Sequence, residues 1–191
     1  MAVVRWTSVL TYLSAAALLG AAVSQLAGWT TVRGWFLLAW AVLLLPVAIG
    51  LFRHPMRVPA WGVFVGFWGT VGGLWLIVVQ IFAVAGSLSG EVYHEWAAWP
   101  LAVVGVWFLV ASGLGFGAER FPRLVDLLGL LAGAGLVAIS VSTWIGTSSD
   151  VVRAVGLFAS VAYCLWTIGL GWVFWRANVG RSLRLASHRA A

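Results

Sequence analysis

The residues best suited to metal chemistry lie in one short stretch, Glu-Val-Tyr-His-Glu from Glu91 to Glu95. If this stretch is helical, Glu91, His94 and Glu95 share one face, and Glu91-x-x-His94 has the spacing of half a carboxylate-bridged two-metal site. Such a site needs a second copy of the motif and further carboxylates, and the sequence supplies neither. Acids are also typical of a solvated helix start, where they face the positive end of the helix dipole. We therefore predict no metal site and keep Glu91, His94 and Glu95 as the alternative.

Residues for other cofactor or catalytic chemistry are sparse. The chain has no lysine for a retinal Schiff base, and Cys164 is its single cysteine. Its three histidines, His54, His94 and His188, are predicted in different compartments or in a tail, which argues against a bis-histidine haem. No charged residue or histidine falls near the centre of a predicted span, which weighs against proton relays and ion paths. We predict no catalytic residue and no cofactor.

Neutral polar side chains within the apolar runs are the remaining candidates for ligand contact. Tyr163 and Thr167 share one helical face with Gly171. A threonine hydroxyl can bond its own helix backbone, whereas the amide of Gln80 needs a partner inside the protein. The candidates for ligand contact are therefore Gln80, Tyr163 and Thr167. A cavity lined by them would favour a ligand-binding bundle over a solidly packed scaffold.

These candidates must be positioned by long apolar helices, because hydrophobic residues make up 63% of the chain and charged residues only 8%. A helix needs about 20 mostly apolar residues to cross a bilayer. Six runs meet this requirement, at 6–28, 34–52, 60–86, 97–117, 124–146 and 151–175. The sequence therefore predicts an all-α, six-helix transmembrane domain over residues 1–175, followed by a basic tail over 176–191.

The arginines orient the predicted bundle. There are 11 arginines and no lysines, and the net charge is +6. Cytoplasmic loops of membrane proteins are enriched in basic residues. With the N-terminus inside, nine arginines are cytoplasmic and only Arg33 and Arg153 fall outside. This split predicts cytoplasmic termini in a multi-pass protein of the cell (inner) membrane, and it explains the positive charge without nucleic-acid binding.

The spans pair into three helical hairpins, which suggests an internal repeat. When the first and last hairpins are laid side by side, Arg5 matches Arg123 and Gly28 matches Gly146. Positive-inside topology can also produce this spacing without a repeat.

Small residues at spacings of four predict where the helices pack. Lipid tails are as apolar as leucine, so membrane helices associate through close packing and hydrogen bonds. We expect Gly20→Leu to separate the first span from a neighbouring helix. The predicted packing positions are Ala16, Gly20, Ser24, Gly28, Gly62, Gly66, Gly69, Gly73, Gly129 and Gly133.

The last third of the chain carries a proline-led loop, a Gly-rich helix and a Trp-rich final helix that ends in arginine. The residues are Phe121-Pro122-Arg123, Gly129, Gly133, Leu170-Gly171 and Arg176. In this pattern the segment resembles bacterial six-helix integral membrane proteins of uncharacterised function. The resemblance implies a membrane bundle and supplies no functional residue.

The sequence favours a non-enzymatic accessory or scaffold subunit that packs against lipid and another membrane protein or a second copy of itself. The basic tail is expected to attract anionic lipid. The main alternative is a small permease or binding bundle for a neutral or apolar, lipid-like molecule. A membrane enzyme is the third possibility.

Overall fold

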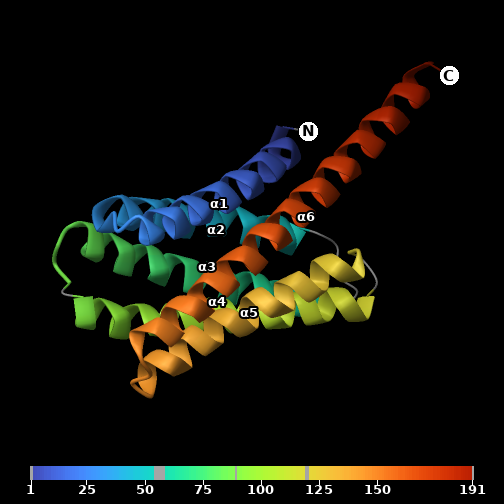
Figure 1. Cartoon of the computed structure of the whole chain (residues 1–191). Helices are drawn as coiled ribbons and strands as arrows, with labels where there is room; N and C mark the ends of the chain where they lie inside the picture. Colours follow the sequence, from blue (N-terminus) through green and yellow to red (C-terminus); the bar gives the residue numbers. More distant parts are fainter. Residues whose placement is uncertain (1, 54–58, 89, 119–120, 191) are drawn as a thin grey trace.

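The computed structural model describes residues 2–53, 59–88, 90–118 and 121–190, and all regular structure in these ranges is helical. Each helix is long and apolar enough to cross a membrane. The prediction of an all-α, six-helix bundle is therefore confirmed, and the protein is a multi-pass membrane protein by this measure. The helices, shown in Figure 1, are α1 (Ala2–Leu26), α2 (Thr30–Arg53), α3 (Pro59–Val84), α4 (Gly90–Ala118), α5 (Arg123–Trp144) and α6 (Ser149–Ala190).

The helices form a closed ring in sequence order. Each helix contacts the next one along the chain, and α6 returns to contact α1. Within the described residues, no helix contacts another across the ring. The beginning of α6 belongs to the ring, whereas its backbone continues past the bundle through the predicted basic tail (Figure 1). The ring must therefore be filled by side chains rather than by a central helix.

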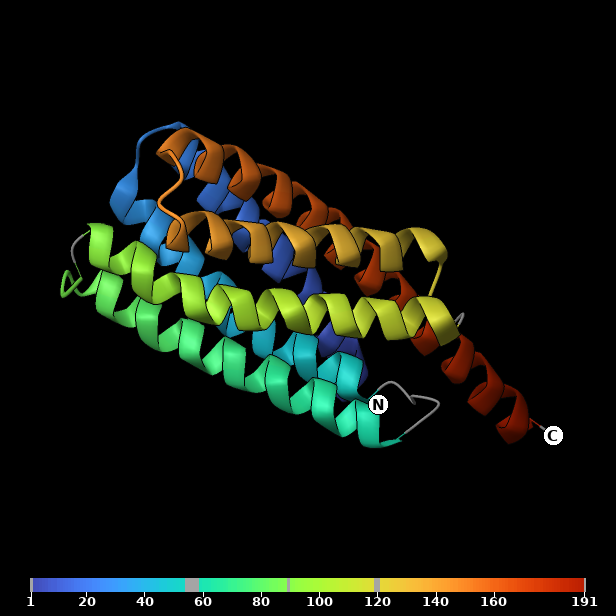
Figure 2. The ribbon, with the colours of Figure 1, turned by 90° about the horizontal axis from the view of Figure 1, so that it is seen from below.

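Three glycine turns with the same geometry close the hairpins. Gly28, Gly86 and Gly146 have φ values of 74°, 73° and 68°, a left-handed conformation that favours glycine. In each turn the glycine N–H bonds the carbonyl three residues back at 3.1 to 3.3 Å, and the following N–H bonds the carbonyl five residues back at 2.8 to 2.9 Å. These bonds satisfy carbonyls at the helix end. The three turns lie together at what we name the glycine-turn end, opposite the two termini (Figure 2).

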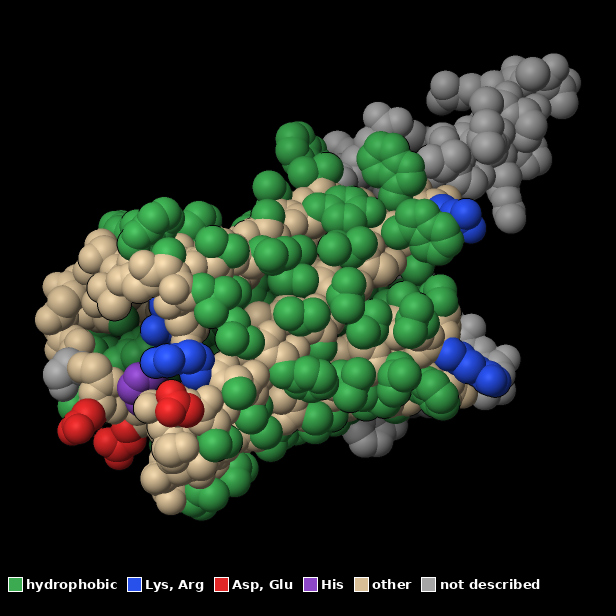
Figure 3. All heavy atoms as spheres, in the orientation of Figure 1, with side chains coloured by type: hydrophobic (Ala, Val, Ile, Leu, Met, Phe, Trp, Pro, Cys, Tyr) green, Lys and Arg blue, Asp and Glu red, His purple; other side chains and the backbone are tan. Residues whose placement is uncertain are grey.

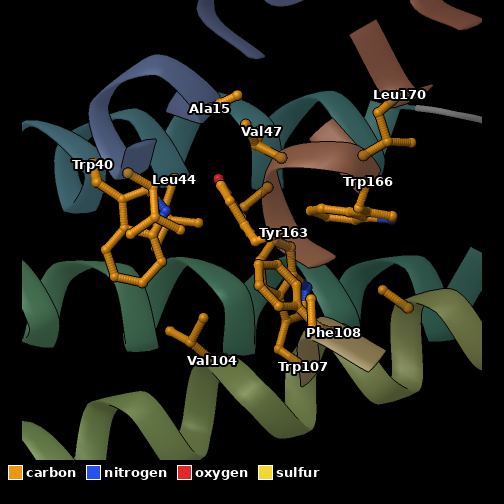
Figure 4. Close-up of a cluster of buried hydrophobic side chains, with 14 of the residues drawn as sticks. Ala15, Trp40, Leu44, Val47, Val104, Trp107, Phe108, Tyr163, Trp166 and Leu170 are labelled. Carbon is orange, nitrogen blue, oxygen red and sulfur yellow. The ribbon is translucent and has the colours of Figure 1, made fainter. Parts of the chain in front are cut away.

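Large aromatic side chains fill the middle of the ring. Trp40, Trp107, Phe108, Tyr163 and Trp166 are all at most 2% exposed. Trp40 meets Tyr163 edge-on, with ring centroids 5.6 Å apart, and Phe108 lies 4.7 Å from Trp166. Figure 4 shows these side chains converging from α2, α4 and α6. Aromatic rings have the volume that a six-helix ring requires and gain from edge-to-face contacts.

The seam between α1 and α6 is held by hydrogen bonds between buried groups. The Ser8 hydroxyl donates to the carbonyl of Gly171 at 2.8 Å. Ser14 and Tyr163 share a hydrogen bond of 2.5 Å between their hydroxyls. In the absence of water, such interhelical bonds help to fix which helices become neighbours.

The backbones of α4 and α5 approach each other closely at two glycines. A Cβ built on Gly133 would lie 2.7 Å from the carbonyl oxygen of Gly105, and one built on Gly105 would lie 2.9 Å from the carbonyl oxygen of Gly133. Gly129, one turn earlier on α5, faces the side chains of Ser112 and Trp166. The spacing of Gly129 and Gly133 thus corresponds to a real helix contact.

The glycines of α3 face side chains rather than backbone. The Trp107 indole lies over Gly69, and Gly73 faces a leucine of α2. Gly66 is half-buried, and its carbonyl accepts a hydrogen bond from a threonine of the same helix. The surroundings of Gly62 lie outside the described part of the structure.

The structure differs from the predicted packing stripe on α1 at two positions. Ala16 is exposed, and Gly28 has no atom within 4 Å of a built Cβ because it forms the turn after the helix. Gly20 lies against the Phe36 ring, and Ser24 is buried but donates to its own helix at 2.7 Å. Spacing alone could not identify the buried face of α1, because the helix offers small residues on several faces.

Candidate functional site: a cavity inside the ring

A cavity of about 760 Å³ opens at the glycine-turn end of the ring, and all six helices contribute to its lining. Its volume lies within the range of roughly 300–1,000 Å³ typical of small-molecule sites. From Ser149 at the mouth to Tyr163 at the floor, α6 rises by about 20 Å. For comparison, the hydrocarbon core of a bilayer is about 30 Å thick. We refer to it as the ring cavity.

The floor of the ring cavity is the side of the aromatic core that faces the glycine-turn end. Trp40 and Tyr163 belong to both, together with Leu18, Leu101 and Leu136. The Tyr163 hydroxyl is already bonded to Ser14 of α1. The floor therefore presents mainly apolar and aromatic surface to any occupant.

A polar pair lies on one wall, formed by α3 and α4. The Gln80 amide nitrogen donates to the Tyr93 hydroxyl at 2.8 Å. Gln80 is 2% exposed, and its carbonyl oxygen Oε1 is buried without a hydrogen-bond partner in the described part of the chain. A buried amide oxygen without a partner costs about 1–3 kcal/mol. Gln80 thus has a carbonyl oxygen that is buried without a partner, and the Tyr93 hydroxyl retains its own proton to donate.

The opposite wall, formed by α1, α5 and α6, has its hydroxyls turned onto their own helices. Thr143 donates to the carbonyl of Ile139 at 3.0 Å, and Ser160 donates to the carbonyl of Gly156 at 2.8 Å. Ile139 and Ala159 add apolar surface to the same wall. This wall thus combines apolar side chains and self-bonded hydroxyls with Gln25 of α1 and Arg153 of α6, whereas the buried Gln80–Tyr93 pair lies on the wall of α3 and α4.

The mouth carries charge of both signs (Figure 3). Arg33, Glu91, His94 and Arg153 line it. Arg153 lies 3.8 Å from Asp150 in an exposed ion pair, which contributes little stability at a solvated surface. Arg33 is half-buried, and no carboxylate of the described residues lies within ion-pair distance of it.

The predicted ligand contacts are brought together only in part. Gln80 and Tyr163 line the ring cavity on different helices. Thr167 lies one turn beyond Tyr163 along α6, where its hydroxyl donates to the carbonyls of Tyr163 and Cys164. Thr167 therefore satisfies itself on its own helix, as threonine does by default.

Two of the three metal alternatives, Glu91 and His94, lie at the cavity mouth, whereas Glu95 is exposed outside its lining. Among the residues that the structure describes, no three His, Cys, Asp or Glu side chains converge on a point that could hold a metal ion. The sequence spacing therefore brings Glu91 and His94 to one place without supplying a third ligand.

Sequence reasoning missed Arg33, Tyr93 and Trp40 as parts of the site. The available sequence signal for Arg33 was its predicted position outside the cytoplasm, which departs from the positive-inside distribution of the other arginines. Tyr93 and Trp40 carried none, because their roles depend on which helices become neighbours. Comparison with protein-family models, with curated proteins and with solved structures finds no match.

Proposed function

We propose that this protein binds a lipid-like molecule in the ring cavity, either to hold it or to move it across the membrane. The observation that carries the proposal is the cavity of about 760 Å³ inside the ring, whose lining includes Gln80, a buried residue with a carbonyl oxygen that has no hydrogen-bond partner among the described residues. Structural polar groups inside a bundle are normally paired. A rigid accessory subunit has no need for an open hollow, so the cavity favours the ligand-binding alternative over the scaffold.

The test is native mass spectrometry of the protein purified in mild detergent, to detect and weigh any molecule that remains bound. Gly156→Phe should abolish the bound mass, because Gly156 lines the ring cavity and a Cβ there meets only Ile139, at 3.9 Å. Gly113→Phe is the matched control, since Gly113 has no atom within 4 Å of a built Cβ and lies outside the cavity lining.

Loss of the bound mass in the Gly156→Phe protein alone supports the proposal. No bound mass in the parent protein, or equal loss in both variants, would contradict it. Gln80→Leu should weaken retention, whereas Thr70→Val should not, because Thr70 lies on the same helix and bonds the carbonyl of Gly66 at 2.8 Å.

We also propose that the protein resides in the cell (inner) membrane. In the proposed orientation the mouth of the ring cavity faces outward, and both termini face the cytoplasm. The nine-to-two arginine split supports this orientation. Ser87, in the turn between α3 and α4, is exposed. A cysteine at Ser87 should react with an impermeant reagent added outside cells, whereas one at Ser187 should not; the reverse pattern would overturn the orientation.

The projecting part of α6 supports a role in binding anionic lipid. Arg176 lies over the Trp172 ring, 3.8 Å from its centroid, and Arg181, Arg184 and Arg189 follow along the chain. Basic residues beside a membrane contribute about 1 kcal/mol each to binding an anionic surface.

A further inference from the structure

The Arg33 side chain is half-buried and has no ion-pair partner among the described residues. It lines the ring cavity from α2, and no carboxylate of the described residues lies within 4.0 Å of it. Arg153, the other arginine at the mouth, is exposed and has Asp150 at 3.8 Å. Removing a guanidinium from water without a counter-ion is costly. Of the two arginines, only Arg33 is both drawn into the cavity and left with its charge uncompensated.

The surroundings of Arg33 join it to the polar wall. Its charge acts on both Tyr93 and His94 of α4. Tyr93 in turn accepts the hydrogen bond from Gln80 of α3. Arg33, Tyr93 and Gln80 thus form one polar strip across α2, α3 and α4, with a cation towards the mouth and a hydrogen-bonded pair on the cavity wall.

Across the cavity from this strip, α1, α5 and α6 contribute apolar side chains such as Ala21, Ile139 and Ala159, and the cavity ends on the aromatic floor. Building on the proposed ligand-binding function, we propose that the occupant is an acidic amphiphile. Its carboxylate or phosphate group binds the Arg33 guanidinium, and its apolar chain lies against the opposite wall and the floor. The planar fork of arginine pairs with either anion through two parallel hydrogen bonds. A positively charged head would be repelled at this position, and a neutral head would leave Arg33 uncompensated.

The test measures binding of ω-bromododecanoate to the whole protein in nanodiscs of zwitterionic phosphatidylcholine. Bromine quenches indole fluorescence at short range, so Trp40 on the cavity floor reports the position of the chain end. Comparison with a Trp40→Phe protein isolates that signal. Competition by dodecanoate, dodecyl phosphate and dodecanol then ranks the head groups, and nanodiscs containing phosphatidylglycerol ask whether a bilayer lipid takes the same site.

We expect Arg33→Gln to weaken dodecanoate binding about tenfold, the factor for one charge-assisted hydrogen bond, and to leave dodecanol unchanged. Arg153→Gln should weaken dodecanoate binding less, because Arg153 already has Asp150 at 3.8 Å. Arg123→Gln is the matched control and should change neither, because Arg123 begins α5 and is not part of the cavity lining. The head-group preference between dodecanoate and dodecyl phosphate identifies the acid, and displacement by phosphatidylglycerol would identify a bilayer lipid as its source.

Two outcomes overturn the inference in distinguishable ways. If dodecanol binds as tightly as dodecanoate and both quench Trp40, the cavity holds a ligand but Arg33 does not select an acid. If no probe quenches Trp40, both the acidic amphiphile and the ligand-binding function are wrong. Equal losses in Arg33→Gln and Arg153→Gln would show that only the general charge of the mouth matters. Unfolding of each variant in the same nanodiscs checks that the fold is retained.

Discussion

Replacing Gly133 by alanine should separate α4 from α5. The added Cβ would lie 2.7 Å from the carbonyl oxygen of Gly105 and 2.9 Å from the backbone nitrogen of Leu109. Both atoms belong to the backbone of α4, so neither can rotate away as a side chain would. The two helices must move apart or shift along each other, and either movement disturbs the aromatic core beside them.

The expected cost follows from two opposing effects. Overpacking a well-filled contact destabilises by about 1–3 kcal/mol. Alanine is the better helix former and returns up to about 1 kcal/mol relative to glycine. Because both neighbouring atoms belong to the backbone, the cost should lie at the upper end of that range, and the net loss in the free energy of unfolding should be about 2 kcal/mol. Gly113→Ala is the matched control on α4, because nothing lies within 4 Å of its built Cβ. It should leave stability unchanged or raise it by up to about 1 kcal/mol.

The assay is reversible unfolding by sodium dodecyl sulfate in mixed micelles, followed by tryptophan fluorescence. The midpoint should fall for Gly133→Ala and hold or rise for Gly113→Ala. Equal midpoints for the Gly133→Ala protein and the parent would refute the close approach of α4 and α5.

Further predictions concern α1, its seam with α6, and the cavity mouth. Gly20→Leu should cost less in the same titration than Gly133→Ala, because Gly20 faces only the Phe36 ring, which is 37% exposed and can swing outward; a larger loss would mean that Phe36 is fixed. Tyr163→Phe should lose about 0.6 kcal/mol, the average for an interhelical hydrogen bond in a membrane, and Ser14→Ala should add nothing to it in the double variant. Additive losses would show that the two hydroxyls act separately. The purified protein should contain no stoichiometric transition metal and show no Soret band, and a metal signal lost on His94→Ala would contradict this.

The helices could be predicted because each one depends on its own stretch of sequence rather than on contacts with distant residues. A run of about 20 apolar residues has few alternatives in a bilayer, where backbone groups must be paired within the segment. The helix ends were harder to place, because a transmembrane helix can continue through polar residues at the membrane interface. The apolar run then ends before the helix does. Thus α4 begins at Gly90 rather than near 97, and Glu91 and His94 become part of the cavity.

Helix contacts could be predicted only where regularly spaced small residues also face a neighbouring helix. Gly129 and Gly133 have a recognisable spacing, and they do meet α4. Their partner Gly105 has no glycine four residues away, so the sequence gives it no signal. On α1 the spaced residues include the exposed Ala16, whereas the buried face carries other small residues, such as Ala17 and Ala21, beside the hydroxyls that bond α6.

Among the residues that line the cavity, Gln80 could be singled out from the sequence, because a buried amide requires a hydrogen-bond partner in any fold. Arg33 and Tyr93 reach the same wall from other helices, and no spacing along the chain could relate them. Their proximity depends on the closed ring, which is a property of all six helices together.

The closed ring also constrains how the protein is made. Helices emerge from the ribosome in order, and each contacts the one before it, so hairpins can enter the membrane successively. Until α6 arrives, Ser8 and Ser14 of α1 lack their partners Gly171 and Tyr163 and face an unfinished bundle. The final helix thus supplies both the closing contacts and part of the cavity floor. A nascent chain that stalls before α6 would expose these hydroxyls to lipid, a feature by which membrane quality control could recognise an incomplete molecule.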